Sequence, residues 1–196
     1  MKKGEKRKLE LLKIAYKMFL TRGYENTSVD EIIEEAGIAK GTFYYYFQSK
    51  EQLLEEVIGM MIDEEAERAC EVLNTDLPIP QKITAVILSF RPASEEATIE
   101  EALFHPDNVL MHNKIKKRLL DTAIPLLSKI VEEGNEKGIF ICDNIPERVH
   151  MMLIVSSEIF DEGEFTERDI EVFIDLSEKL LGAKAGTMGF IRDMIG

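Results

Sequence analysis

Residues 27–54 read TSVDEIIEEAGIAKGTFYYYFQSKEQLL, and this stretch decides the fold. Ser28 is followed three residues later by Glu31, which is the spacing of a capping box and predicts a helix that begins near Val29. The apolar residues of this helix recur at i, i+3, i+4 and i+7 and form one buried stripe: Val29, Ile32, Ile33 and Ala36. Gly37 permits a sharp reversal, and a second helix is predicted over residues 40–47. Together these features predict a helix-turn-helix.

The second helix of this pair has two unlike faces. Phe43 and Phe47 lie at i and i+4 and are expected to face inward. The opposite face carries Gly41 and Tyr45, where a purely structural helix would normally place Glu and Lys. Glycine lets a backbone approach another surface closely, and tyrosine hydroxyls can donate to phosphate oxygens. This face therefore indicates contact with DNA.

The tyrosines also have a simpler explanation, which is that they cover a small core. Tyr44, Tyr45 and Tyr46 are consecutive, however, and successive helical residues point about 100° apart, so the three cannot all be core. Thr42 beside them can hydrogen-bond a base edge or contact a thymine methyl group. At least part of this helix is thus expected to be a contact surface.

A longer pattern of residues resembles the signature of the tetracycline-repressor (TetR) family of transcriptional regulators. It comprises Ala15, Phe19, Gly23-Tyr24, Thr27, residues 32–37, the run KGTFYYYF at 40–47, Ser49-Lys50-Glu51 and Leu53-Leu54, roughly the first quarter of the chain. The resemblance implies an all-α fold with a three-helix DNA-binding domain over residues 1–49 and a helical ligand-binding and dimerisation domain over 50–196. It also implies a homodimer that leaves a palindromic operator when a small molecule binds.

Carried over residue by residue, the resemblance implies two kinds of DNA contact. The residues at bases would be Lys40, Gly41, Thr42 and Tyr45. The residues at phosphates would be Ser28, Tyr44, Tyr46 and Lys50. The chain departs from the family twice: Ala39 stands where Ser or Thr is frequent, and Tyr46 where His is common. Losing the helix cap at residue 39 would cost about 1 kcal/mol of helix stability.

The charge of the chain is divided unevenly. The formal net charge is −13, yet residues 1–50 hold 10 Lys or Arg against 7 Asp or Glu, a net +3, which leaves 14 against 30, a net −16, for residues 51–196. Five basic residues near the N-terminus could reach a phosphate backbone: Lys2, Lys3, Lys6, Arg7 and Lys8. A disordered, solubilising N-terminus explains those residues equally well.

The cysteine content and the apolar runs bear on location. The sequence has 2 cysteines, far apart and without metal-ligand spacing, as expected in a reducing cytoplasm. The longest apolar runs, such as 151–155, fall far short of the roughly 20 residues that span a bilayer. We therefore expect a cytoplasmic protein without a membrane partner.

The hydrophobic periodicity, together with the proline and glycine residues that end helices, predicts the remaining helices. They are expected at about 6–21, 50–74, 81–91, 99–104, 108–135, 146–161 and 167–181. Pro125 should kink the helix over 108–135 or mark a join between two helices. Residues 182–196 include 4 glycines and are expected to be partly loose.

The last two predicted helices carry apolar stripes. A single chain could bury both stripes internally, whereas the resemblance favours pairing with a second chain in a twofold four-helix bundle. The predicted interface residues are Val149, Leu153, Phe160, Ile170, Phe173, Ile174, Ser177 and Leu181.

Flexible apolar and aromatic side chains in the predicted ligand-binding domain, residues 50–196, are candidates for a ligand pocket. They are Met60, Met61, Ile87, Phe90, Phe104, Met111 and Leu119. Core packing explains most of them equally well. The 30 acidic residues of the body favour a cationic amphipathic ligand over an anionic one.

An enzyme is the rival class of function. His105, His112 and His150 lie in no recognisable metal or nucleophile motif, and no glycine-rich phosphate loop is present. No catalytic residue, metal or cofactor is therefore predicted. The sequence predicts a homodimeric DNA-binding transcriptional regulator, a repressor rather than an activator, that responds to a small-molecule effector. The alternative is a ligand-independent DNA-binding regulator, and an enzyme ranks third.

Overall fold

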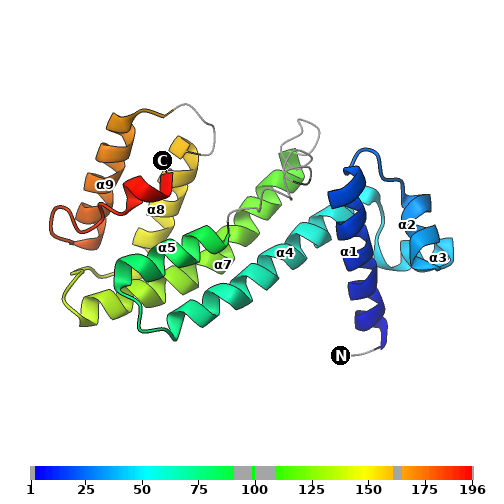
Figure 1. The fold of residues 1–196 in the computed structure, drawn as a ribbon, viewed down its shortest axis with the longest axis horizontal. Helices are drawn as coiled ribbons and strands as arrows, with labels where there is room; N and C mark the ends of the chain where they lie inside the picture. Colours follow the sequence, from blue (N-terminus) through cyan, green and yellow to red (C-terminus); the bar gives the residue numbers. More distant parts are fainter. Residues whose placement is uncertain (1–2, 91–98, 100–108, 161–164, 196) are drawn as a thin grey trace. The chain divides into compact units, whose positions relative to one another are not determined.

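The computed structural model describes residues 3–90, 99, 109–160 and 165–195, and all regular secondary structure in these ranges is helical. The helices are α1 (Lys3–Arg22), α2 (Val29–Ala36), α3 (Lys40–Tyr46), α4 (Lys50–Leu73), α5 (Ile79–Ser89), α7 (Val109–Glu136), α8 (Ile145–Phe160), α9 (Glu167–Leu181) and α10 (Ile191–Ile195) (Figure 1). The all-α prediction is confirmed. The helix predicted over residues 99–104, together with Phe104 and His105, lies outside the described residues apart from Ile99, which is helical and buried.

The chain divides into two compact units. The N-terminal unit comprises Met1–Glu64 and Pro92–Arg118, and the C-terminal unit comprises Glu65–Arg91 and Leu119–Gly196. Helices α4 and α7 therefore each contribute residues to both units.

The core of the N-terminal unit lies between α1, α2, α3 and the start of α4. Its fully or nearly fully buried members are Leu11, Leu12, Ala15, Phe19, Tyr24, Ile32, Phe43, Phe47, Leu53 and Leu54. The rings of Phe19 and Tyr24 meet edge to face with centroids 5.2 Å apart. Burying each Leu, Ile or Phe side chain contributes about 1.5–3 kcal/mol. This core fixes the positions of α2 and α3.

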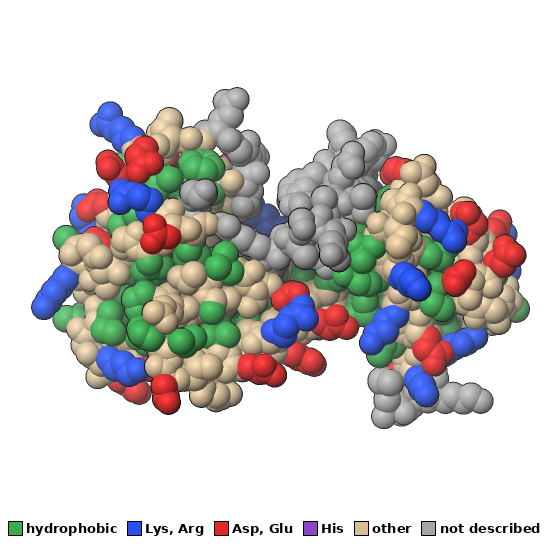
Figure 2. All heavy atoms as spheres, in the orientation of Figure 1, with side chains coloured by type: hydrophobic (Ala, Val, Ile, Leu, Met, Phe, Trp, Pro, Cys, Tyr) green, Lys and Arg blue, Asp and Glu red, His purple; other side chains and the backbone are tan. Residues whose placement is uncertain are grey.

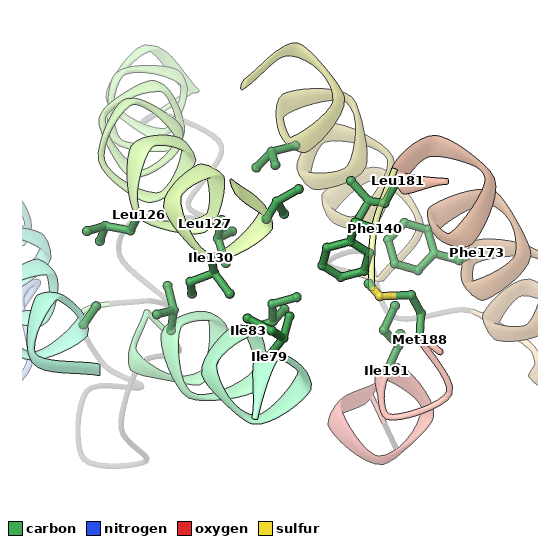
Figure 3. Packing of buried hydrophobic residues seen from close by; sticks show 14 residues of the cluster. Ile79, Ile83, Leu126, Leu127, Ile130, Phe140, Phe173, Leu181, Met188 and Ile191 are labelled. Carbon is green, nitrogen blue, oxygen red and sulfur yellow. The ribbon is translucent and has the colours of Figure 1, made fainter. Parts of the chain in front are cut away.

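The core of the C-terminal unit is built from α5, α7, α8, α9 and the chain that follows α9. Figure 3 shows Ile79 and Ile83 of α5 beside Leu127 and Ile130 of α7, with residues of α9 and the C-terminal segment gathered next to them. Phe140, in the connection between α7 and α8, is also buried in this cluster. The apolar stripe of each helix is thus used within the unit.

Helix α7 continues through Pro125, so this proline does not mark a join between two helices. Proline removes one backbone hydrogen bond and crowds the preceding turn, at about 3 kcal/mol. The residues around it offset that loss, because Ala123, Leu126 and Leu127 are buried. Tertiary packing of an apolar face supplies most of the stability of helices in proteins.

Residues 182–196 were expected to be partly loose, and the described part of this segment includes side chains that pack onto the core. Met188, Ile191 and Met194 are all buried, and residues 191–195 form α10. Gly182 caps α9 with φ 62°, and a Cβ there would overlap the carbonyl oxygen of Ile141. Gly182 and Gly186 thus adopt the left-handed conformations of turns, and Met188, Ile191 and Met194, spaced three apart, are buried.

No described helix is both long and apolar enough to cross a membrane. Within the described ranges, no group of three or more His, Cys, Asp or Glu side chains is arranged to hold a metal ion.

Candidate nucleic-acid interface

The first helix of the helix-turn-helix begins at the predicted capping box. Ser28 Oγ accepts from the Glu31 N–H at 3.2 Å, and the Ser28 N–H donates to Glu31 Oε2 at 2.8 Å. The hydrogen bonds from Ser28 hold the pKa of Glu31 below its ordinary value. The helix ends at Gly37, which adopts φ 59°, a left-handed conformation that glycine reaches without strain. The turn therefore follows from local chemistry.

Helix α3 is anchored through its aromatic residues. Phe43 and Phe47 are completely buried, and their ring centroids are 5.7 Å apart. On the other side Tyr44 and Tyr45 are 48% and 80% exposed. The exposed side of α3 therefore carries large aromatic rings that a partner could cover.

Gly41 lies on the exposed side of α3 and has no role in the packing of the chain. A Cβ added there would meet no atom within 4 Å, and its φ is not in the left-handed region. A glycine inside a helix costs roughly 0.5–1 kcal/mol relative to alanine. The fold gains nothing from this glycine, and the open space beside it leaves room for another surface to approach the backbone closely.

Lys40 is paired on the surface. Its Nζ lies 2.9 Å from Asp30 Oδ1, and this hydrogen bond raises the pKa of Lys40. Both side chains are well exposed, and exposed ion pairs contribute little to stability. Lys40 can therefore exchange Asp30 for a base or a phosphate at low cost.

Lys50 has a structural role that the sequence did not reveal. Its Nζ donates to the carbonyl oxygen of Tyr24 at 2.9 Å and lies 4.1 Å from the centroid of the Tyr24 ring. Burial, and next the charges of Glu51 and Glu25, raise the pKa of Tyr24, so its ring is neutral under the lysine. Lys50 thus joins the start of α4 to the start of the α1–α2 connection, and has donors left for a phosphate.

Ser28 and Tyr46 are also engaged within the unit. Ser28 Oγ donates to Glu31 Oε2 at 2.7 Å. The Tyr46 hydroxyl lies 3.7 Å from the position that a Cβ on Gly4 of α1 would take, and the half-buried Tyr46 ring meets the Tyr45 ring edge-on at 5.0 Å. A phosphate contact by Ser28 would have to displace Glu31. Thr42, in contrast, is half-buried on α3 beside Gly41.

Two of the basic residues near the N-terminus serve the fold of the unit. Arg7 pairs with Glu10 at 2.9 Å and donates to the carbonyl oxygen of Ala36 at 3.3 Å. Lys8 pairs with Glu56 at 2.8 Å. Figure 2 shows Lys and Arg side chains interleaved with Asp and Glu on this unit. The contacts of Arg7 with Ala36 and of Lys8 with Glu56 join residues far apart in the sequence, so a count of charges did not identify these roles.

The missing cap at Ala39 is confirmed, because its side chain makes no hydrogen bond to α3 although its backbone is extended as in a capping residue. We expect Ala39→Ser to raise the free energy of unfolding by about 1 kcal/mol, since the hydroxyl can accept from an unpaired N–H of the first turn. The melting temperature should rise by about 2–4 °C in a thermal scan. Ala39→Val, which offers no acceptor, is the control; an equal rise in both variants would contradict the capping argument.

The predicted ligand residues are scattered. Ile87 lines an apolar cavity of about 90 Å³ in the C-terminal unit, and Met111 lines a more polar cavity of about 590 Å³ in the N-terminal unit. Met60, Met61, Phe90 and Leu119 are half-buried and line neither cavity. Phe104 lies outside the described residues.

The predicted interface residues lie mostly in the core of a single chain. The chain buries five of the eight in its own core: Val149, Ile170, Phe173, Ser177 and Leu181. Leu153, Phe160 and Ile174 are half-buried and pack against the same core. Because α8 and α9 lie against each other and the unit, their stripes turn inward. The outer surface of this helix pair instead exposes Met151, Ile154 and Val172.

Comparison with known proteins agrees with this geometry. The family model for bacterial regulatory proteins of the tetR family matches residues 11–57. The HTH-type transcriptional repressor KstR2 of Mycolicibacterium smegmatis is 33% identical over 101 residues, 52% of this chain and 49% of that protein. The uncharacterized HTH-type transcriptional regulator YhgD of Bacillus subtilis is 26% identical over 180 residues, 88% of this chain and 93% of that protein. The alignment with KstR2 thus spans about half the length of that protein.

Solved structures share the fold over nearly the whole chain. RolR without ligand superposes with a TM-score of 0.65 at 19% identity, covering 95% of both chains. RolR in complex with resorcinol gives a TM-score of 0.64, covering 99% of this chain and 95% of that one. The matched residues 11–57 are those that build the capped α2, the turn at Gly37 and the anchored α3. This part of the chain is therefore similar to the bacterial regulatory proteins of the tetR family.

Proposed function

We propose that the protein is a homodimeric transcriptional repressor that binds a palindromic operator through α3 and leaves it when a small molecule binds. One observation carries the DNA-binding part: α3 exposes Gly41, Tyr44 and Tyr45 while two buried phenylalanines hold it in place. A helix held in this way can enter a major groove with its first residues at base edges. The names of the relatives, a repressor and a regulator, support this reading.

Dimerisation is proposed through the outer surface of α8 and α9. Met151, Ile154 and Val172 are exposed apolar side chains on two helices that contact each other. Covering them requires an apolar partner surface, and a twofold axis offers the same surface of a second copy. Two copies would supply the two recognition helices that a palindromic operator needs.

Release by a ligand is proposed to act through α4 and α7, since each helix belongs to both units. Within the N-terminal unit, Lys114 and Arg118 of α7 pair with Glu55 and Asp63 of α4 at 3.0 and 2.7 Å. A shift of α7 caused by a ligand would therefore reach the helix that follows α3 directly. The RolR–resorcinol complex is an example of a protein of this fold that holds a small molecule. Linkage requires that operator DNA and ligand weaken each other equally.

The role of Gly41 gives a test of the DNA-binding proposal. We expect Gly41→Ala to leave the fold intact, and to stabilise it by roughly 0.5–1 kcal/mol, because the added methyl group meets open space. We expect DNA affinity to fall at least tenfold, about the 1–3 kcal/mol of one good base contact. Fluorescence anisotropy with duplexes that the unaltered protein selects from a random pool measures this.

Lys13→Ala, at an exposed position of α1, is the control. It removes one positive charge, and we expect it to change the DNA affinity by no more than about twofold. If Gly41→Ala bound the selected duplexes as tightly as the unaltered protein, α3 would not be the reading helix. If the random pool yielded no preferred duplex, sequence-specific DNA binding itself would be excluded.

A further inference from the structure

The C-terminal unit contains a partly open apolar cavity of about 90 Å³ between α5, α7, α8, α9 and the C-terminal segment. Its lining residues are Ile83, Ile87, Leu127, Val131, Val149, Met152, Leu153, Ser156, Phe173, Leu181, Met188, Ile191 and Met194. Figure 3 shows labelled members of this set on both sides: Ile83 and Leu127 on one, and Phe173, Leu181, Met188 and Ile191 on the other. The cavity thus lies between helices that are far apart in the sequence.

The lining determines which chemistry the cavity can accept. Among the described residues that line it, none carries a charge, and Ser156 contributes the single hydroxyl group. Met152, Met188 and Met194 contribute flexible, polarizable side chains that can adapt to different shapes. Sites of this kind bind apolar molecules and use few polar groups to orient them.

We propose that this cavity is the effector site and that it takes a small uncharged molecule, mostly apolar, with one hydroxyl or carbonyl group hydrogen-bonded to Ser156. The assignment rests on the proposed function for its regulatory meaning, but the binding itself does not depend on DNA. The cavity is smaller than the roughly 150 Å³ apolar cavity that accepts benzene. A ring-sized ligand therefore requires the three methionine side chains to change rotamer.

The acidic character of the chain suggests a different ligand, and the two effects can be compared. Residues 51–196 carry a net charge of −16, which favours a cation at the surface. Attraction by exposed charges is screened over about 8 Å at physiological salt. A cation inside the cavity would lose its hydration water and find no charged partner there. The free-energy cost of this desolvation is far larger than the gain from the screened surface attraction. The lining therefore decides the ligand class.

The test uses four probes of similar size that differ in one group: toluene, benzyl alcohol, benzylammonium and benzoate. Each is titrated into the full-length protein at pH 7 by calorimetry and in thermal-shift assays. We expect toluene and benzyl alcohol to bind and to raise the melting temperature. We expect benzylammonium and benzoate to bind at least about a hundredfold more weakly, because their charge is unpaired in the cavity. Equal or tighter binding of benzylammonium would overturn the proposal, as would the failure of both neutral probes to bind.

Variants locate the binding within the unit. Ser156→Ala should reduce the affinity for benzyl alcohol about two- to tenfold, the value of one hydrogen bond, and leave toluene unchanged. Ile87→Phe should fill the cavity and abolish binding of both neutral probes. Leu88→Phe, the same enlargement at the exposed neighbour, should leave binding unchanged. Circular dichroism of each variant reports whether it is folded, and retained binding in folded Ile87→Phe would place the probes elsewhere.

The outcome separates this proposal from the proposed function. Neutral probes that bind the cavity without changing DNA affinity would support the ligand class and contradict release by this cavity. A protein that binds selected duplexes yet none of the neutral probes would retain its DNA-binding function and lose this effector site.

Discussion

Phe173→Asp is expected to unfold the C-terminal unit, whereas Val172→Asp is expected to leave it folded and to convert a dimer into monomers. The two residues are neighbours on α9, but Phe173 is 6% exposed and Val172 is 59% exposed. Phe173 packs edge-on against Phe160, with ring centroids 5.3 Å apart, and belongs to the core of the unit.

The expected loss for Phe173→Asp is at least about 4 kcal/mol. Truncating a buried phenylalanine alone costs about 3–5 kcal/mol, and a carboxyl group without a partner adds to that. This is a large part of the stability of a typical domain, about 5–15 kcal/mol. At Val172 a carboxylate stays in water in the monomer, but a twofold interface would bury two like charges near each other.

Light scattering and circular dichroism distinguish the two variants. The unaltered protein should be a dimer, Val172→Asp a helical monomer, and Phe173→Asp should have lost helical signal or should aggregate. Val172→Ala controls for the removal of the side chain and should weaken association less. A dimeric Val172→Asp would remove α9 from the proposed interface, and a stable, fully helical Phe173→Asp would contradict the described core.

Glu133→Ala is expected to cost about 3–5 kcal/mol, because it leaves the charge of Lys82 buried without its partner. Lys82 on α5 is only 3% exposed; its Nζ donates to Glu133 Oε2 at 2.7 Å and to the carbonyl oxygen of Leu73 at 3.2 Å. Removing both charges should be far less harmful than removing one. The double variant Glu133→Ala, Lys82→Met should therefore recover most of the loss, as urea unfolding of the variants would show.

The Lys82–Glu133 pair also predicts that the free energy of unfolding depends on pH. Hydrogen bonds from Lys137, and then from Lys82, hold the pKa of Glu133 below its ordinary value of 4.5. A carboxyl group with a lowered pKa in the folded state contributes stability that is fully present above that ordinary value and is lost as the pH falls through the folded-state pKa. Unfolding measured from pH 6 to pH 3 should show this loss in the unaltered protein and a smaller one in the double variant. Identical pH profiles would contradict the linkage.

The recognition of α2 and α3 from sequence succeeded because their signals are local. Ser28 and Glu31 are three residues apart, Gly37 acts through its own backbone, and Phe43 and Phe47 are one helical turn apart. Each signal lies within one or two turns of helix and works in the same way in any surroundings. The sequence alone therefore determined the helix-turn-helix and the exposed face of α3.

Tertiary structure decided what depends on distant partners. Lys50 meets Tyr24 across 26 residues, and Lys82 meets Glu133 across 51, so neither pairing follows from spacing on one helix. The apolar stripes of α8 and α9 could have faced a second chain or their own core, since periodicity shows that a face is buried and not what covers it. The folded chain buries Met188 and Ile191 in that core and leaves Val172 and Ile154 exposed. Burial against a particular neighbour is a property of the folded chain, because apolar attraction has no direction of its own.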